Sequence, residues 1–199
     1  TWVPKKEIIH FLNNVPSSVL VVLDEAYFEY VHSQCYPNGI NLQKDYENLI
    51  VTRTFSKAYG LAGLRIGYSV SNPEVADMMN RIRQPFNVNS LSLVAASLAL
   101  DERDFIDESI LMNTQGMKFL EKTFAGLNLE YIPSAGNFLT VDLGQRALPI
   151  YESLLEKGII VRPIEVYGLP NHLRVSIGLP HENERFSEAL AEVLGTLES

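Results

Sequence analysis

Residues 52–70 read "TRTFSKAYGLAGLRIGYSV" and place Lys57 in a run of small residues and glycines. An apolar, strand-like segment precedes this run and another follows it. Lysine prefers solvent and glycine weakens regular structure, so the combination indicates a backbone that comes close to a ligand, with the amine pointed at it. A surface loop with an ordinary solvated lysine is the alternative interpretation of these residues taken alone.

Composition predicts a globular chain with one large domain or two small ones. Of 199 residues, 46% are hydrophobic and 20% are charged, which is enough apolar material for a core. The net charge of −8 argues against a nucleic-acid or anionic-membrane surface, and no apolar run reaches the length of a membrane span. Cys35 is the single cysteine, which favours the reducing cytoplasm.

Three apolar segments flank this motif and predict one sheet: residues 18–24, 48–54 and 65–70. The first two are continuous and β-branched, which is typical of parallel strands buried on both faces. Only about a dozen residues separate the second segment from the third, whereas a parallel crossover needs a dozen or more and usually a helix. We therefore expect the third strand to be antiparallel to the second.

This arrangement brings three chemically distinct side chains to one edge of the sheet. Lys57 and Arg65 follow the second strand and begin the third, and Asp24 ends the first strand. If the first two strands are parallel, all three residues face the crevice at which open α/β sheets bind ligands.

The remainder of the chain predicts a second unit of mixed helices and short strands. We expect residues 1–105 to belong to a larger domain and residues 106–199 to a small α+β domain. The expected helices are 4–14, 73–83, 90–100, 103–124, 148–156 and 182–196, and the expected further strands are 128–132, 138–142, 159–162 and 172–177.

An acid, an amine and a guanidinium together match the three handles of pyridoxal 5′-phosphate (PLP). A buried carboxylate such as that of Asp24 favours a protonated ring nitrogen, and the amine of Lys57 can form a Schiff base with an aldehyde. Arg65, which follows a glycine-rich loop, suits a phosphate dianion. The residues themselves therefore indicate a PLP site.

Two stretches, "LDEAYFEY" (23–30) and "TFSKAYGLAGLRIGY" (54–68), resemble the signature of fold-type I PLP-dependent aminotransferases. The likeness is greatest to histidinol-phosphate aminotransferases, and "VRPIEVYGLPNHLRVSIG" (161–178) is similar to the carboxyl-terminal motif of that family. The resemblance implies an α/β fold: part of a large domain with a mostly parallel sheet and one antiparallel strand, followed by a small α+β domain.

The resemblance also implies a role for each cofactor-binding residue. Lys57 would be the Schiff-base lysine and the proton carrier. Asp24 would pair with the pyridinium nitrogen, and Tyr27 would donate to the phenolic oxygen of the ring. Ser56 and Arg65 would hold the cofactor phosphate.

Three further residues would face the substrate. Arg174 would bind its acidic group, a role that suits the bidentate fork of arginine. Arg162 resembles the arginine that histidinol-phosphate enzymes use on the substrate phosphate. Asn137, in "AGNF", resembles an asparagine of the small domain near the substrate.

The implied reaction is transamination of L-histidinol phosphate with 2-oxoglutarate, which forms glutamate, in histidine biosynthesis by a cytoplasmic homodimer. Aromatic amino acid aminotransferases and threonine-phosphate decarboxylases share most of these residues, and a non-catalytic PLP-binding regulator is a third alternative. Family members are considerably longer and begin upstream, so we expect this chain to be the carboxyl-terminal part and to be inactive alone.

Other titratable residues carry no predicted chemistry. Glu25 adjoins Asp24, but adjacent strand residues face opposite sides, so we do not expect a shared acid–base role. No metal site is predicted, because the histidines lack metal-ligand spacing; they are His10, His32, His172 and His181.

Overall fold

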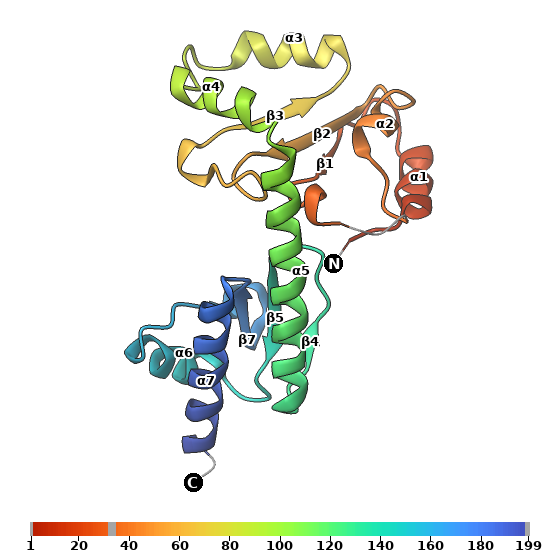
Figure 1. The fold of residues 1–199 in the computed structure, drawn as a ribbon. Coiled ribbons are helices and arrows are strands. Elements are labelled where there is room, and N and C mark those ends of the chain that lie inside the picture. The colour runs from red at the N-terminus through yellow and green to blue at the C-terminus, as the bar shows by residue number, and fades with distance from the viewer. Residues whose placement is uncertain (1, 32–34, 198–199) are drawn as a thin grey trace. The chain divides into compact units, whose positions relative to one another are not determined.

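The computed structural model describes residues 2–31 and 35–197, which form two compact units (Figure 1). One unit comprises Trp2–Ser109, and the other begins at Ile110. The division falls within the long helix α5 (Arg103–Gly126). The assignment of a large and a small domain that meet at residue 105 stays a prediction.

The first unit is built on a three-stranded sheet in the order β1-β2-β3. Its strands are β1 (Val21–Asp24), β2 (Leu49–Thr54) and β3 (Gly67–Val70). β1 is parallel to β2, with Asp24 opposite Thr52, and β2 is antiparallel to β3. Both predicted strand directions are confirmed, so the carboxyl ends of β1 and β2 meet at one edge of the sheet.

The prediction that residues 18–24 are buried on both faces is wrong for this chain. β1 begins only at Val21, and its residues alternate between half-buried and exposed. Val22 is 60% exposed, and Val19 and Leu20, which precede the strand, are also exposed. In the described residues β1 pairs only with β2, so one of its sides has no neighbouring strand.

Helices pack on this sheet through small apolar clusters. Ile8 and Leu12 of α1 join Leu42, Leu49 and Val51 in one buried cluster. Asn72 and Asn89 cap two of the helices, as their side chains accept the amides of the third helical residues. The helices are α1 (Lys5–Asn14), α2 (Gly39–Gln43), α3 (Pro73–Ile82) and α4 (Ser90–Ala99), with 3₁₀ turns η1 (Phe28–Tyr30) and η2 (Ala62–Leu64).

The second unit contains an antiparallel sheet in the order β4-β5-β7-β6. The strands are β4 (Tyr131–Ile132), β5 (Phe138–Asp142), β6 (Arg162–Ile164) and β7 (Leu169–Ser176), and the remaining elements are α6 (Ala147–Glu156), η3 (Glu165–Tyr167) and α7 (Pro180–Leu197). The strand predicted at 159–162 instead begins at Arg162. β7 begins earlier than the predicted 172, directly after Gly168 in a left-handed turn.

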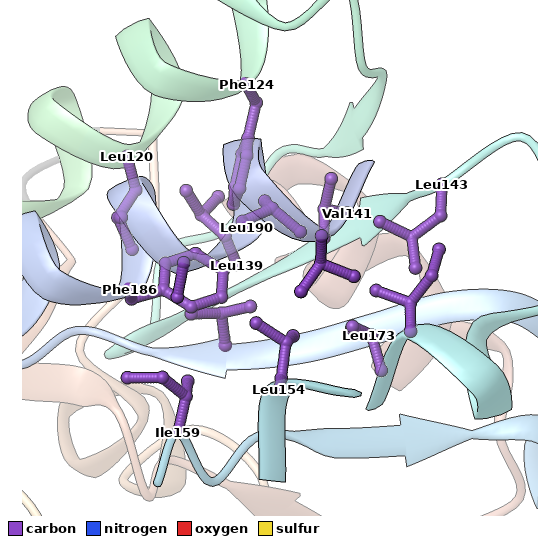
Figure 2. Close-up of a cluster of buried hydrophobic side chains, with 14 of the residues drawn as sticks. Leu120, Phe124, Leu139, Val141, Leu143, Leu154, Ile159, Leu173, Phe186 and Leu190 are labelled. Carbon is purple, nitrogen blue, oxygen red and sulfur yellow. The ribbon is translucent and has the colours of Figure 1, made fainter. Parts of the chain in front are cut away.

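Along the two central strands, β5 and β7, successive residues point to opposite faces of the sheet, and one of these faces is apolar. Leu139 and Val141 of β5 lie beside Leu173 and Val175 of β7 in the main core of this unit (Figure 2). Side chains from α5, α6 and α7 complete this core; they include Leu120, Phe124, Ile150, Leu154, Phe186 and Leu190. The intervening residues, among them Arg174, therefore point to the opposite face.

Candidate functional site

Asp24 lies where β1 ends, at the edge at which sequence analysis places it. Its Oδ1 accepts the backbone amide of Ala26 at 3.0 Å, a local Asx turn that orients the carboxylate. The amide of Glu25 donates to the carbonyl of Thr52 at 2.9 Å and continues the pairing of β1 with β2. Asp24 is exposed rather than buried as expected, because it is the last residue of a strand at an open edge of the sheet.

Lys57 follows β2 in a tight turn at the same edge. Its carbonyl accepts the amide of Gly60 at 2.9 Å, and Thr54 Oγ1 accepts the amide of Ser56 at 3.1 Å. The Nζ atom of Lys57 lies 5.2 Å from the centroid of the Tyr27 ring. No ion pair of Lys57 with a carboxylate occurs in residues 2–31 or 35–197. At this edge of the sheet, Tyr27 therefore lies close to an amine that forms no ion pair with a carboxylate of the described residues.

Ser56 and Arg65 place two donors beside each other. Arg65 Nη1 lies 3.4 Å from Ser56 Oγ and donates to the carbonyl of Ala62 at 3.0 Å. Arg65 has a left-handed backbone (φ 52°), which is uncommon for a residue with a Cβ atom and occurs often at binding sites. A hydroxyl and a guanidinium held together in this way suit the oxygens of a phosphate.

At two positions of the motif, Gly60 and Gly67, the conformation or the packing of the chain disfavours a Cβ atom. Gly60 has a φ of +71°, and a Cβ atom there would lie 3.2 Å from Phe105 Cζ. A Cβ atom at Gly67 would lie 2.7 Å from the carbonyl oxygen of Arg53 on the paired strand. Sequence analysis assigned the glycines of the motif to close approach of the backbone to a ligand. The packing around Gly60 and Gly67 is a separate reason for glycine at these two positions.

In the second unit, Arg162 of β6 lies directly opposite Arg174 of β7. Cross-strand partners share a sheet face, so both guanidinium groups extend from the same side. Arg162 is exposed and Arg174 is half-buried, with its Cζ atom 5.1 Å from the centroid of the Phe138 ring. Neither arginine forms an ion pair with a carboxylate in the described residues. Two such cations on one face can bind an anion.

Asn137 precedes β5 in a loop held from two sides. Its carbonyl accepts the amide of Ile177 at 2.9 Å, and the carbonyl of the preceding Gly136 accepts Asn113 Nδ2 at 3.1 Å. The backbone at Asn137 is therefore well anchored, whereas the role of its side chain stays a prediction.

Sequence reasoning missed a buried ion pair beside the predicted cofactor residues. Glu25 is buried and pairs with Arg53 of β2, at 2.8 Å between Oε2 and Nη2. Burial of Glu25 next to an exposed Asp24 agrees with opposite orientations of the two carboxylates. The available signal was an acid and a base at the ends of two strands already predicted to be neighbours.

Residues 2–31 and 35–197 hold neither a metal-binding cluster nor a membrane-spanning helix. No group of three or more His, Cys, Asp or Glu side chains there could hold a metal ion, and His32 lies outside the described residues. None of the described helices has the length and apolar character needed to cross a membrane.

β1 and β2 are parallel strands of an α/β unit, and an acid, an amine and a guanidinium lie at their carboxyl edge, the position at which open α/β sheets bind ligands. The family model for aminotransferase class I and II matches residues 1–190, so the chain belongs to that family.

Curated relatives carry a more specific name. The chain is 57% identical over 194 residues to histidinol-phosphate aminotransferase 2 of Pseudomonas fluorescens (strain Pf-5), covering 98% of this chain and 52% of the relative. It is also 57% identical over 195 residues to histidinol-phosphate aminotransferase 2 of Pasteurella multocida, covering 98% and 53%. The chain thus spans about half the length of the curated relatives it matches.

Solved structures agree with this fold. One is histidinol-phosphate aminotransferase from Sinorhizobium meliloti, solved in complex with pyridoxal-5′-phosphate. It superposes on this chain with a TM-score of 0.92 at 35% identity, and the superposition covers 99% of this chain and 55% of the solved chain. L-threonine-O-3-phosphate decarboxylase from Porphyromonas gingivalis superposes with a TM-score of 0.83 at 26% identity and covers 99% and 60%.

Proposed function

We propose that the full-length protein carrying this chain is a PLP-dependent aminotransferase that acts on L-histidinol phosphate and 2-oxoglutarate in histidine biosynthesis. The observation that carries the substrate assignment is the cross-strand pair Arg162 and Arg174, whose two guanidinium groups extend from one face of the second unit. The names of the relatives at 57% identity support the same assignment.

The donor set at the edge of the first sheet fits PLP. Ser56 and Arg65 bind its phosphate through a hydroxyl and a guanidinium that already lie 3.4 Å apart. Asp24 accepts from the protonated ring nitrogen, and Tyr27 donates to the phenolic oxygen. When bound, PLP supplies an electron sink for the negative charge that develops on the substrate carbon bearing the amine.

Lys57 has two tasks in this proposal. Its Nζ atom holds the aldehyde of the cofactor in the resting protein, and it moves the proton at the substrate carbon during the reaction. Two observations support these tasks. Nζ lies 5.2 Å from the centroid of the Tyr27 ring, beside the proposed position of the cofactor ring. No carboxylate in the described residues forms an ion pair with this amine.

The arginine pair sets the substrate class. A phosphate dianion gains more from two guanidinium forks than a single carboxylate does, through charge-assisted hydrogen bonds. Arg174 alone serves the carboxylate of glutamate in the other half-reaction, and Arg162 adds selectivity for the phosphate.

Comparison of kcat/KM for three amine donors tests this assignment in the full-length protein. We expect histidinol phosphate to exceed phenylalanine and glutamate. Preference for phenylalanine would contradict the proposal and favour an aromatic amino acid aminotransferase. PLP binding without turnover of any amine would favour a non-catalytic regulator.

A threonine-phosphate decarboxylase is the second candidate, because the same arginine pair would hold any phosphorylated amine. The likeness to the Porphyromonas gingivalis decarboxylase at 26% identity supports keeping it. Release of CO₂ from L-threonine phosphate, without transfer of the amino group to 2-oxoglutarate, would favour this candidate over the first.

We propose in addition that the full-length protein is a cytoplasmic homodimer and that residues 1–199 alone are inactive. Three largely exposed apolar side chains on α3, α4 and their connection, Ile82, Phe86 and Leu91, supply surface for the second copy, and Phe86 is 95% exposed. Sedimentation of the full-length protein as a monomer would contradict the dimer. Transaminase activity of residues 1–199, purified free of other peptides, would contradict inactivity.

A further inference from the structure

Glu25 and Arg53 form a buried ion pair immediately behind the proposed PLP residues. Glu25 Oε2 accepts Arg53 Nε at 3.0 Å and Nη2 at 2.8 Å, so the guanidinium meets the carboxylate side-on. The Glu25 side chain is fully buried, and that of Arg53 is 10% exposed. Two donors on one oxygen fix both the distance and the angle between the side chains.

The other oxygen of Glu25 joins the pair to a third segment of the unit. Oε1 accepts the amide of Gly39 at 2.8 Å, and Tyr36 also hydrogen-bonds to Glu25. Arg53 Nη2 donates in addition to Asn38 Oδ1 at 2.9 Å. The carboxylate and the guanidinium are therefore both surrounded by partners, as a charge pair taken out of water requires.

Arg53 also clamps the turn that carries Tyr27. Its Cζ atom lies 3.7 Å from the centroid of the Phe28 ring, while its nitrogens bind Glu25. The amide of Phe28 donates to the carbonyl of Glu25 at 3.0 Å and closes the turn. Arg53 therefore contacts the residues on either side of Ala26 and Tyr27, one through its charge and the other through its planar face.

The position of Arg53 in β2 links this turn to the lysine. Arg53 directly precedes Thr54, whose Oγ1 accepts the amide of Ser56, and Lys57 follows. Glu25 directly follows Asp24. One side-chain pair thus connects the strand end that carries Asp24 and Tyr27 with the strand end that carries Lys57.

Stability alone is a weak reason for such a pair. The cost of taking two charges out of water offsets much of their attraction, and well-packed apolar residues often serve equally well. Here burial lowers the pKa of Arg53, but the hydrogen bonds and charges of Glu25 and Tyr68 together outweigh burial and raise that pKa, so the guanidinium stays charged. A charged, planar fork supplies what an apolar pair lacks, which is a fixed orientation.

We propose that Glu25 and Arg53 are positioning residues that hold Asp24 and Tyr27 at a fixed separation from Lys57, and thereby align the ring of PLP with the amine. This inference rests on the proposed PLP site. It assigns a role to a pair that contacts neither cofactor nor substrate in that proposal.

The test compares Arg53→Lys, Arg53→Met and Glu25→Gln/Arg53→Met in the full-length protein. We expect each to weaken PLP binding about 10- to 100-fold, measured by fluorescence titration, because small displacements of aligned groups carry such costs. At saturating PLP, kcat should fall by a similar factor while KM for histidinol phosphate changes less than threefold. Lysine should not substitute for Arg53, because it keeps the positive charge but lacks the planar fork of arginine.

The double variant keeps the test decisive where a single variant does not fold. It removes both charges, so no unpaired ion stays buried, and the amide oxygen of glutamine can still accept from Gly39. Leu42→Ala is the matched control: it removes a buried side chain of α2 and lowers the melting temperature without touching the ion pair.

Four outcomes decide the inference. Loss of PLP affinity and kcat in the Arg53 variants, with near wild-type values in Leu42→Ala at a comparable melting temperature, supports it. Wild-type affinity and kcat in folded Arg53→Lys and in the double variant would overturn it. An equal loss of PLP affinity and kcat in Leu42→Ala would show that the pair only stabilises the fold, and would also overturn the inference. Absence of PLP binding by the wild type would instead overturn the proposed function, and the positioning role with it.

Discussion

Arg162 and Arg174 are direct cross-strand partners, so two positive charges extend from the same face of one antiparallel pair. Like charges directly opposite each other destabilise a sheet. No carboxylate in the described residues forms an ion pair with either arginine to offset this repulsion. A bound dianion would offset it, which gives a physical reason for the arrangement.

The first prediction follows from this repulsion. In the full-length protein, inorganic phosphate should raise the melting temperature of the wild type, because binding to the folded state stabilises it. Arg162→Ala should show a smaller rise, and its melting temperature without phosphate should not fall. Differential scanning fluorimetry over a phosphate series measures both. An equal phosphate effect in the variant would remove Arg162 from the anion site.

The same substitution should alter substrate preference. Loss of one charged contact should cost roughly 2–4 kcal/mol, or about thirty- to a thousandfold in kcat/KM for histidinol phosphate. Activity with glutamate should suffer less, because in the proposed function Arg174 binds its carboxylate. Steady-state kinetics with both substrates measure the ratio. Equal losses for both would contradict a specific role of Arg162 toward the phosphate.

Lys57→Ala should abolish the covalent attachment of PLP. In the wild type, borohydride should fix the cofactor onto Lys57, and mass spectrometry of a proteolytic digest should locate it there. The variant should incorporate no cofactor and lose turnover, because no other side chain at this edge replaces the amine. Ser69→Ala on β3 is a control outside the proposed site. Retained turnover in Lys57→Ala would contradict the assignment.

Asp24→Asn should leave PLP bound but slow proton abstraction by orders of magnitude. An uncharged partner does not keep the ring nitrogen protonated, so the ring withdraws electrons poorly. The phosphate contacts proposed for Ser56 and Arg65 are untouched. Stopped-flow absorbance of the first half-reaction measures the step. Near wild-type rates would show that Asp24 serves only to shape the Asx turn at Ala26.

Sequence reasoning located the edge of the first sheet because the relevant signals are local. The short connection between β2 and β3 forces the antiparallel direction, and Lys57 and Arg65 fall within that connection. The opposition of Arg162 and Arg174 depends on the register across Gly168 and on an irregularity between Pro163 and Ile164, which no local pattern specifies.

Burial and long-range contacts could not be derived in the same way. Val22 looks like a core residue from its neighbours in sequence, but its exposure depends on what pairs with β1. Glu25 and Arg53 are separated by 28 positions and become partners only through the parallel register of their strands. The position at the strand end pointed to Asp24 and gave Glu25 no role, whereas Glu25 is the buried one of the two carboxylates and forms the ion pair.

Tyr36 provides a pH-dependent test of the network around Glu25. Burial, together with the charge of Glu25 and a hydrogen bond to it, raises the pKa of Tyr36 from 10.0 to about 12. Between these pH values the folded state retains a proton that the unfolded chain releases, so this contribution to stability is complete below pH 10 and is lost as pH rises toward 12. The free energy of unfolding should therefore decline less over this interval in Tyr36→Phe than in the wild type. Urea denaturation at a series of pH values measures the difference, and parallel declines would contradict a coupling of Tyr36 to Glu25.

Gly67→Ala should destabilise the first unit, whereas Gly63→Ala should not. A Cβ atom at Gly67 would lie 2.7 Å from the carbonyl oxygen of Arg53, so β2 and β3 must separate to admit it. Overpacking of this kind typically costs about 1–3 kcal/mol. A Cβ atom at Gly63 meets nothing within 4 Å, and that residue has no positive φ, so alanine there should be neutral or slightly stabilising. Urea denaturation of the full-length protein without cofactor separates this backbone effect from any effect on phosphate binding. Equal stability of the two variants would show that β2 and β3 can separate without cost, and the requirement for glycine at position 67 would then have to come from the ligand.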